Sequence, residues 1–547
     1  MPNWTKEQEQ AIYESGKNII VSAGAGSGKT AVLSERVLQK VLNGVSIDRL
    51  LILTFTNLAA REMKERIRKK VKKDPNLREQ LNKLDASYIT TFDSYSLSIV
   101  KKYHYLLNIS SKVNIIDKNI LDMQIEKFID LIFENKYQEQ DPKFIKLIND
   151  FCIKDDISIK KEIISLNDKL NMKYDKDYYL NNYIDFYYNI DFIKENINKY
   201  TRLIKIKIDN IISLVNELYG YCESDYIDKC NGILSGLFNA KTYEDYLCIH
   251  TIKLPNLKRG SEEEAKIIKT KIGDLIKETK ELVRFENTNE MEEIILSTKD
   301  YLEVIIEIIK ELDVMVNEYK HENDLYDFVD ISKLAIKIVK ENEDIKNEIK
   351  NYFQEILVDE YQDTSDLQEE FISTIANNNV YMVGDIKQSI YRFRNANPNI
   401  FKNKYDNYAK NLGGMKIDLL KNFRSRSEVL DNINLLFRYI LDDYIGGADY
   451  KKSHEMIFGN TTYIEEGLTK QDYNFEIYNY EYNKDLGYTK NEIEAFIIAD
   501  DIINKISNHY QVFDKDEKIL RDIDYSDFVI LIDRSTPFEL YKKIFLY

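Results

Sequence analysis

The segment Asn18–Thr30, with the sequence NIIVSAGAGSGKT, decides the fold of this chain. Its first residues, Asn18–Val21, are typical of a short buried strand, and the loop that follows consists of small residues. The next segment, Ala31–Leu42, carries apolar residues at helical spacing. Strand, glycine-rich loop and helix in this order are typical of a phosphate-binding loop, in which backbone N–H groups and the helix N-terminus attract an anion. The segment therefore predicts a nucleotide site.

The side chains of this loop have predicted roles. Lys29 is expected to reach the β- and γ-phosphates, and the Thr30 hydroxyl is expected to bind Mg²⁺. The predicted phosphate cradle consists of Ala23, Gly24, Ala25, Gly26, Ser27 and Gly28. Ala23 stands where the usual pattern has Gly, and we expect this change to be tolerated because Ala is the next smallest residue. The alternative is a glycine-rich turn that binds nothing, and the flanking strand and helix argue against it.

Composition restricts the class of protein. The chain has 547 residues, 44% of them hydrophobic, which allows about three or four domains with ordinary cores. A formal net charge of −16 disfavours nucleic-acid binding through an overall positive field, although a locally basic groove remains compatible with it. The four cysteines lack a C-x-x-C pair, so we predict reduced thiols and neither a zinc site nor a disulfide framework. No apolar run approaches the ~20 residues of a membrane span, so we expect a cytoplasmic protein without a membrane partner.

Further strands are predicted along the chain. Leu50–Leu53 and Ser87–Phe92 each precede a polar tip and a helix, which is the order of a parallel α/β sheet with ligands at the carboxyl ends of its strands. From about Asp117 to Asn351 the pattern is helical, so we expect an all-α insertion within the α/β domain. The α/β pattern resumes at Glu355–Val358.

The strand Glu355–Val358 leads directly into two acids, Asp359 and Glu360. Adjacent carboxylates are costly to bury unless their charge is offset, and Mg²⁺ on a nucleotide would offset it. We expect Asp359 to hold the metal through water and Glu360 to polarise the attacking water. The alternative is a strand that ends in solvated acids, which would be preferred if the phosphate loop were absent.

Another predicted strand, Val380–Val383, leads to further polar and aromatic residues. Gln388 follows it closely enough to reach a γ-phosphate. Tyr391, Phe393 and Arg394 alternate aromatic and cationic groups, as a surface that stacks the bases of a single strand would. A buried aromatic pair is the structural alternative.

Other segments carry weaker signals. Met415–Leu420 is a predicted strand, and Arg424 beyond it is well placed to neutralise phosphate charge. Upstream of the loop, Gln8 could pair with both a donor and an acceptor on an adenine edge, because an amide supplies both functions. Near the end of the chain, Tyr473–Tyr482 alternates like a strand and Phe528–Ile532 has the composition of a buried one.

Taken together, eight motifs in this order resemble those of the UvrD/Rep-type superfamily 1 DNA helicases, and most closely the AddA-type helicase–nuclease subunits. The motifs are WTKEQ (residues 4–8), AGAGSGKT (23–30), TFTNLAAREM (54–63), TTFDSYS (90–96), YDFVDI (326–331), LVDEYQDT (357–364), VGDIKQSIYRFR (383–394) and LLKNFRSRS (419–427). The resemblance covers residues 1–110 and 320–430 well, and the helical segment between them only by position.

The resemblance implies roles for individual residues. At an ATP site it implies Gln8 and Phe423 against adenine, Lys29 and Thr30 on phosphate and Mg²⁺, Glu360 as catalytic base, and Gln388 and Arg424 at the γ-phosphate. Single-stranded DNA would be gripped by Phe55, Thr56 and Asn57 together with Tyr391, Phe393 and Arg394. Asp93 departs from the His that is common in the family, and we leave it out because a carboxylate repels DNA phosphate.

The resemblance also implies a fold. We expect an α/β protein with a RecA-like P-loop parallel sheet, a large all-helical insertion and an incomplete second RecA-like lobe. The predicted bounds are 1–110 and 351–415 for the first lobe, 111–350 for the insertion and 416–547 for the start of the second lobe. We find neither the later family motifs nor a nuclease domain in the sequence, so we expect a fragment or a truncated gene product.

The expected function is that of an ATP-dependent 3′-to-5′ single-stranded DNA translocase or helicase motor for recombination and repair. Its expected partners are single-stranded DNA and a second helicase–nuclease subunit of the AddB type. One alternative is a helicase-like DNA-binding scaffold with a vestigial ATPase, against which the intact Lys29, Asp359 and Glu360 argue. Another is a small-molecule kinase, against which the missing substrate lid and the aromatic segment argue. For this chain alone we expect ATP and DNA binding with weak hydrolysis and no unwinding.

Overall fold

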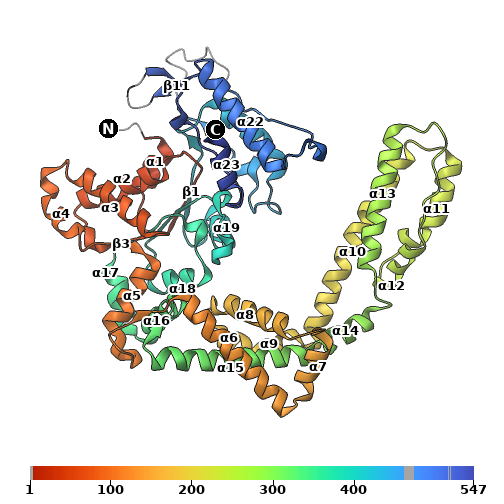
Figure 1. Ribbon diagram of the computed structural model, residues 1–547, viewed down its shortest axis with the longest axis horizontal. Helices are drawn as coiled ribbons and strands as arrows, with labels where there is room; N and C mark the ends of the chain where they lie inside the picture. Colours follow the sequence, from red (N-terminus) through yellow and green to blue (C-terminus); the bar gives the residue numbers. More distant parts are fainter. Residues whose placement is uncertain (1–3, 461–472, 515–516, 518, 547) are drawn as a thin grey trace. The chain divides into compact units, whose positions relative to one another are not determined.

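The computed structural model describes residues 4–460, 473–514, 517 and 519–546 (Figure 1). The chain divides into two compact units, one formed by Met1–Ile99 with Ala335–Tyr547 and the other by Val100–Leu334. These are termed the sheet unit and the helical unit below. The protein is mixed α/β, with a parallel central sheet and mostly helices around it.

Six parallel strands form the central sheet, in the spatial order β3–β2–β6–β7–β1–β8. The strands are β1 (Ile19–Ala23), β2 (Leu50–Thr54), β3 (Tyr88–Thr91), β6 (Glu355–Val358), β7 (Val380–Gly384) and β8 (Met415–Leu419). Strand β1 lies between β7 and β8, and its Ile19 pairs with Tyr381 on one side and Met415 on the other. Because all six strands run in the same direction, their carboxyl ends share one edge of the sheet.

Strand β8 corrects the predicted boundary at residue 416. It pairs with β1 over its whole length, from Ile19–Met415 to Ala23–Leu419, so residues 416–419 belong to the same sheet as the phosphate loop. Ile417 and Leu419 lie in the core that β1 also enters. A parallel strand leaves no local signal of which strand it pairs with, so the prediction placed this one in a second lobe.

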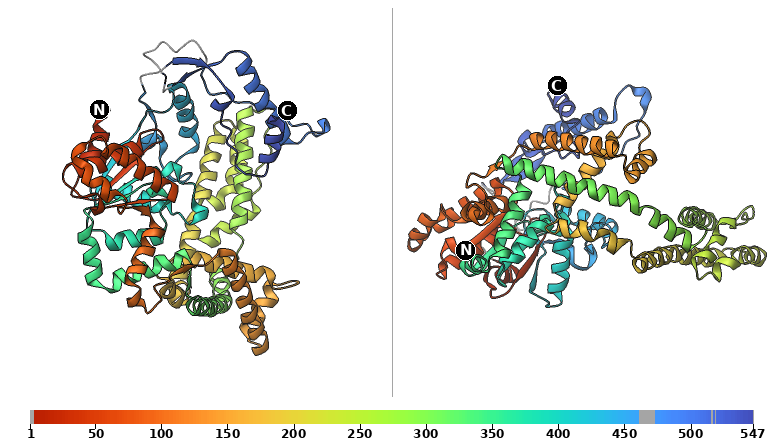
Figure 2. Two further views of the ribbon diagram at one scale, coloured as in Figure 1. Left: turned by 60° about the vertical axis from the view of Figure 1, so that its left-hand side comes forward. Right: turned by 90° about the horizontal axis from the view of Figure 1, so that it is seen from below.

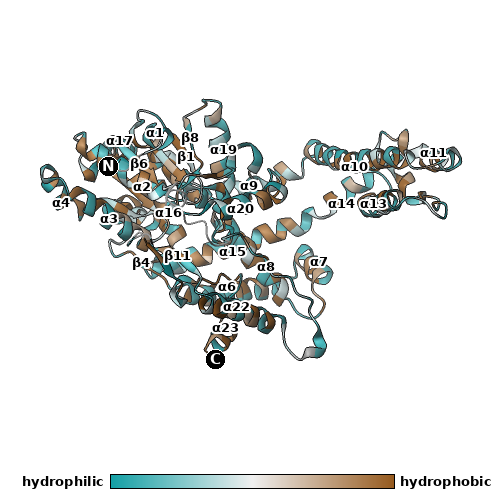
Figure 3. Ribbon diagram, turned by 90° about the horizontal axis from the view of Figure 1, so that it is seen from above, coloured by the Kyte–Doolittle hydropathy of each residue, from teal (hydrophilic) through white to brown (hydrophobic). Residues whose placement is uncertain are grey.

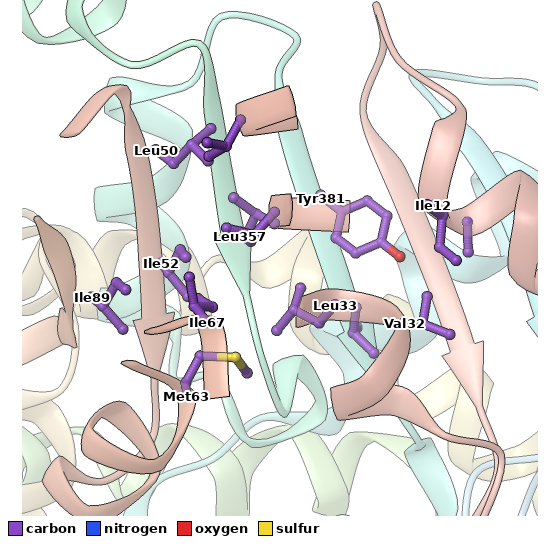
Figure 4. Close-up of a cluster of buried hydrophobic side chains, with 14 of the residues drawn as sticks. Ile12, Val32, Leu33, Leu50, Ile52, Met63, Ile67, Ile89, Leu357 and Tyr381 are labelled. Carbon is purple, nitrogen blue, oxygen red and sulfur yellow. The ribbon is translucent and has the colours of Figure 1, made fainter. Parts of the chain in front are cut away.

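Helices cover the sheet and complete its core. The first three are α1 (Lys6–Tyr13), α2 (Lys29–Leu42) and α3 (Asn57–Val71). Figure 4 shows how their apolar side chains meet those of the strands: Ile12, Val32, Leu33, Met63 and Ile67 pack in one cluster with Leu50, Ile52, Ile89, Leu357 and Tyr381. This apolar cluster holds β1 and the start of α2 in place, and with them the loop between them.

The other helices of the sheet unit are α4 (Arg78–Leu84), α17 (Glu343–Tyr352), α18 (Asp366–Ile375), α19 (Pro398–Ala409), α20 (Ser427–Ile440), α22 (Lys490–Ser507) and α23 (Phe538–Phe545). Two strand pairs lie outside the central sheet: β9 (Lys421–Asn422) with β10 (Ile457–Phe458), and β11 (Gln511–Asp514) with β12 (Ile519–Asp522). Helices α5 (Phe92–Tyr103) and α16 (Phe328–Glu341) each cross the division between the two units.

Two predicted strands near the end of the chain are wrong. Neither Tyr473–Tyr482 nor Phe528–Ile532 forms a strand, and Val529 and Leu531 are 81% and 90% exposed. Apolar or alternating composition favours a strand only where a neighbouring strand supplies hydrogen bonds and a core covers one face. These segments have neither in the described part of the chain.

The helical unit contains α6 (Lys118–Glu139), α7 (Pro142–Phe151), α8 (Ile157–Asn171), α9 (Lys176–Tyr187), α10 (Ile190–Tyr219), α11 (Ser224–Phe238), α12 (Tyr243–Tyr246), α13 (Glu263–Leu282), α14 (Thr288–Ser297) and α15 (Lys299–Glu322). A short parallel pair, β4 (Asn114–Ile115) and β5 (Leu325–Tyr326), joins its two ends. Helices α10 and α13 lie side by side (Figures 1 and 2).

The packing of α10 follows from its sequence. Ile204, Ile208 and Ile211 are buried at helical spacing, and Ile272 of α13 belongs to the same core. Figure 3 shows the resulting alternation of hydrophobic and hydrophilic residues along both helices. A second core, around Phe133 and Ile308, joins α6–α9 to α15. Every helix in the described residues is too short or too polar to cross a lipid bilayer.

Candidate nucleotide and single-strand site

The phosphate loop joins β1 to α2 at the carboxyl edge of the sheet. Gly26 and Gly28 have φ angles of +70° and +85°, a region that glycine enters without steric cost. Gly28 is the N-cap of α2, and the helix begins at Lys29. The N–H groups of the first helical turn therefore have no intrahelical partner and can bind an anion.

Lys29 meets the acid that follows β6. Its Nζ lies 2.9 Å from Glu360 Oε2 and 3.2 Å from Oε1. The structure thus brings together two predicted site residues that lie far apart in the sequence. Glu360 has a φ of +50°, uncommon for a residue with a side chain, so the turn after β6 holds it in a restricted conformation.

The neighbouring acid, Asp359, lies in an unfavourable environment for its charge. Burial, and then the negative charge of Glu360, raise the pKa of Asp359 to about 6. Its Oδ1 accepts a hydrogen bond from Glu360 N at 3.1 Å. A nearby cation would favour the ionised form, so this carboxylate is suited to a position beside a metal ion.

Gln388 lies beyond the carboxyl end of β7 and is held by a buried acid. Its Nε2 donates to Asp385 Oδ2 at 2.8 Å, and Lys387 Nζ lies 2.7 Å from the other oxygen of the same carboxylate. No role for Asp385 was predicted from the sequence. A buried acid that orients a glutamine has no distinctive sequence pattern, because the acid and its burial are separate facts.

Gln362 and Asp363 were also missed, although both lie in the quoted motif LVDEYQDT. Gln362 Nε2 donates to Glu360 Oε2 at 2.9 Å and to Asp363 Oδ2 at 3.0 Å. Burial, and then the charge of Glu360, raise the pKa of Asp363 to about 6. Their position directly after the acid pair is the signal that could have identified them.

The segment that carries Arg424 lies against the phosphate loop. Asn422 Nδ2 donates to Ala25 O at 2.8 Å, and Phe423 N donates to Gly26 O at 2.9 Å. Asn422 Oδ1 accepts from Arg424 N at 2.8 Å. Asn422 is a further residue without a predicted role, and it fixes the backbone of Arg424 beside the loop.

A pocket of about 120 Å³ lies next to the loop. It is lined by Thr5, Glu7, Gln8, Ser27, Asp418, Leu419, Leu420, Lys421, Phe423 and Ile457. Gln8 is buried, its Oε1 accepts from Thr5 N at 3.0 Å, and its Nε2 donates to Ser27 O at 3.0 Å. An amide can accept two hydrogen bonds and donate two, so each end of Gln8 has capacity for one bond to a ligand. Gln8 and Phe423, both predicted to contact adenine, line this one pocket.

Aromatic residues from two strand ends form a second cluster. The rings of Phe55 and Tyr391 lie 4.9 Å apart, and those of Tyr391 and Phe393 lie 5.8 Å apart. The Arg394 guanidinium lies 5.5 Å from the Tyr391 ring and 5.9 Å from the other two. Phe393 is 77% exposed, which excludes the alternative of a buried aromatic pair. Phe55, Tyr391, Phe393 and Arg394 are termed the aromatic cluster below.

Thr56 and Asn57 follow Phe55 at the start of α3. Both are exposed, and Thr56 is the N-cap of the helix, accepting from Ala59 N at 3.1 Å. They present the positive end of a helix dipole next to the aromatic cluster, a combination that suits a phosphate beside a stacked base.

The family described as UvrD/REP helicase N-terminal domain matches residues 4–409 of the chain. The chain belongs to this family. Three similar proteins are named as ATP-dependent helicase/nuclease subunits of the AddA type. The one from Exiguobacterium sibiricum is 31% identical over 97% of this chain and 47% of its own length, and that from Lactobacillus johnsonii is 31% identical over 97% and 48%. The Bacillus cereus protein is 29% identical over 98% and 47%. The chain spans about half the length of the curated relatives it matches.

In this UvrD/REP helicase domain, the donor set at the loop fits a nucleotide-bound Mg²⁺. The described residues contain no group of three or more His, Cys, Asp or Glu side chains that could hold a metal on their own. Mg²⁺ suits such a site, because it commonly takes one or two protein oxygens together with phosphates and water. Ser27 Oγ and Asp363 Oδ1 are buried and have no hydrogen-bond partner among the described residues. A phosphate or a bound water could supply these missing partners.

Proposed function

We propose that this chain is the motor portion of an ATP-dependent DNA helicase that moves along single-stranded DNA in the 3′-to-5′ direction, acting in recombination and repair. One observation carries the proposal: three separated segments, containing Lys29, Glu360 and Asn422, converge on the phosphate loop. A phosphate-binding loop, a general base and an arginine-bearing segment are the parts that phosphoryl transfer to water requires.

The fold supports a more specific assignment. We assign the six-stranded sheet to a RecA-like lobe, the helical unit to an insertion between its strands, and the chain beyond β8 to the start of a second RecA-like lobe. The order of the elements supports it, because the helical unit lies in the sequence between β3 and β6, which both belong to the central sheet.

Hydrolysis follows from the exchange of ion pairs at the loop. When the phosphates of ATP bind at the N-terminus of α2, Lys29 transfers its hydrogen bonds from Glu360 to them. This exchange frees Glu360 to accept a proton from the attacking water. Thr30 and Asp359 hold Mg²⁺, which neutralises phosphate charge, and Gln388 and Arg424 contact the γ-phosphate. In the adenine pocket, Gln8 reads the base edge and Phe423 stacks on the ring.

Single-stranded DNA is the proposed second ligand. The aromatic cluster offers exposed ring faces, and base–aromatic stacking contributes roughly 1–3 kcal/mol per base with little dependence on sequence. Arg394 adds a cation among the rings, and Thr56 with Asn57 offers a helix N-terminus for a phosphate. The relatives are named as one subunit of a helicase/nuclease, and these names support a second subunit, of the AddB type, as the protein partner.

ATP hydrolysis with and without oligo-dT tests the proposal. The wild-type chain should hydrolyse ATP faster when oligo-dT is present, and Lys29→Ala should lower that rate by roughly 100-fold or more. Lys17→Ala is the matched control, because the Lys17 side chain is 42% exposed and pairs only with Glu14 at 3.5 Å among the described residues, and it should keep the wild-type rate. Equal rates for wild type and Lys29→Ala would refute the proposal. Binding of both ligands without any hydrolysis would indicate the scaffold alternative.

A further inference from the structure

The segment Asp385–Asn397, termed the aromatic arm, carries three members of the aromatic cluster. Both of its ends are bonded to the turn that follows β6. At the first end, Asp385 N donates to Gln362 Oε1 at 2.9 Å and Ser389 Oγ donates to Gln362 O at 3.3 Å. At the other end, Asn397 N donates to Thr364 O at 3.0 Å. A displacement of this turn would therefore be transmitted to the arm from both sides.

Gln362 joins this arm to the acids of the nucleotide site. Its Oε1 holds the arm through Asp385 N, while its Nε2 donates to Glu360 Oε2 at 2.9 Å and to Asp363 Oδ2 at 3.0 Å. Only an amide of this length can accept from a backbone N–H at one atom and donate to two carboxylates at the other. Gln362 is 1% exposed, so water is not available to replace these bonds.

The end of β7 is shaped around the same side chain. A Cβ at Gly384 would lie 2.5 Å from Gln362 Oε1 and 3.0 Å from Gln362 N, closer than real Cβ atoms approach. The absence of a side chain at this position thus lets the amide reach the arm. Backbone, burial and hydrogen bonds all restrict Gln362 to one arrangement.

We propose that Gln362 is a positioning residue that couples nucleotide binding to binding of single-stranded nucleic acid by linking Glu360 to the aromatic arm. The inference rests on the function proposed above. Glu360 has one set of partners when it pairs with Lys29 and another when Lys29 binds phosphate. Because the Gln362 amide is bonded to both Glu360 and Asp385, a shift of the carboxylate moves the arm. Coupling of this kind is reciprocal, so each ligand must change the affinity for the other by the same factor.

The test measures binding of fluorescein-labelled oligo-dT by anisotropy, with and without a non-hydrolysable ATP analogue and Mg²⁺. In the wild type, the nucleotide should change the affinity for oligo-dT by roughly 5-fold or more. Gln362→Met keeps the length of the side chain but removes both hydrogen-bonding ends, so the ratio should fall below about 2-fold while each ligand alone binds within about 3-fold of wild type. Gln354→Met, at an exposed position, is the matched control and should keep the wild-type ratio.

A second variant covers the case in which Gln362→Met does not fold, as judged by its thermal unfolding. Gln362→Glu keeps the shape and the acceptor for Asp385 N but sets a carboxylate against Glu360 and Asp363, so it too should lose the ratio. A wild-type ratio in either folded variant would overturn the inference alone, as would a wild type that binds both ligands without any coupling. A wild type that binds neither nucleotide nor oligo-dT would overturn the proposed function as well.

Discussion

At the scale of single residues, a buried ion pair links α2 to β6. Arg36 Nη2 lies 2.5 Å from Glu355 Oε1, and Arg36 Nη1 donates to Ala11 O at 2.9 Å. The guanidinium also lies 4.1 Å from the centre of the Tyr381 ring. Both charged side chains are buried, so each depends on the other for compensation of its charge.

We predict that Arg36→Leu lowers the free energy of unfolding by about 3–5 kcal/mol, because it leaves Glu355 buried without its main partner. Urea denaturation measures the change. Lys40 Nζ lies 3.3 Å from the same carboxylate but is partly exposed, so Lys40→Leu is the control and should cost less than about 1 kcal/mol. The double variant Arg36→Leu/Glu355→Leu should recover much of the loss. A loss below about 1 kcal/mol for Arg36→Leu would contradict the prediction.

His454 gives a second prediction, on pH dependence. Burial, and then the nearby Lys387, lower the pKa of His454 to about 4, while Asp385 and Asp418 act in the opposite direction. The unfolded histidine titrates near about pH 6.5. Between these two pH values the unfolded chain binds more protons than the folded one, so the unfolding free energy falls as the pH is lowered through this window.

We predict that His454→Phe removes this loss, which amounts to about 2 kcal/mol at pH 5 relative to pH 7.5. The ring should fit, because Nδ1 of His454 has no hydrogen-bond partner among the described residues and Tyr405 lies 5.4 Å away, ring to ring. Urea denaturation at several pH values measures it, with the exposed His321→Asn as control. Parallel pH profiles for wild type and His454→Phe would count against the prediction.

At the scale of elements, the phosphate loop is shaped by its contact with Asn422. A Cβ at Gly26 would lie 2.7 Å from Asn422 Nδ2, and the φ of +70° adds strain of about 1–2 kcal/mol for any other residue. The Asn422 side chain cannot move away freely, because it is bonded to Ala25 O and Arg424 N. At Gly24, by contrast, a Cβ would make only an ordinary contact, 3.6 Å from Leu419 O.

We predict that Gly26→Ala weakens Mg²⁺–nucleotide binding about 10-fold, since the strain would be relieved by moving the loop away from its anion-binding shape. Gly24→Ala adds the same methyl group two residues earlier and should stay within about 3-fold of wild type. Titration with a fluorescent ATP analogue compares the two. Similar affinities for both variants would show that the contact with Asn422 does not shape the loop.

At the scale of the whole molecule, the two units have separate hydrophobic cores. We therefore predict two calorimetric transitions, of which only that of the sheet unit responds to nucleotide. A nucleotide at about 100 times its Kd should stabilise that unit by about 2.7 kcal/mol. Ile272→Ala, in the core of the helical unit, should lower the other transition by about 2–5 kcal/mol and so identify it. The prediction fails if nucleotide raises both transitions equally.

Local sequence predicted several features because each depends on neighbouring residues. Thr5 caps α1 through a capping box that includes Gln8, and the strands at β1, β2, β6 and β7 follow from short apolar runs. Periodicity also predicted helices throughout Val100–Leu334. The family to which the chain belongs was indicated by motifs that can be seen in the sequence.

Tertiary structure alone decided the rest. Met415–Leu419 joined the central sheet because parallel pairing depends on which distant strand is available, and Phe528–Ile532 formed no strand because no described strand pairs with it. The bonds of Gln362 to Glu360 and of Asn422 to the phosphate loop arise only when the chain brings the carboxyl ends of β6, β7 and β1 to one edge. The sequence by itself determined the local elements and the chemical groups of the site, since these depend on short-range spacing. The partners of those groups were determined by long-range contacts, which no local pattern encodes.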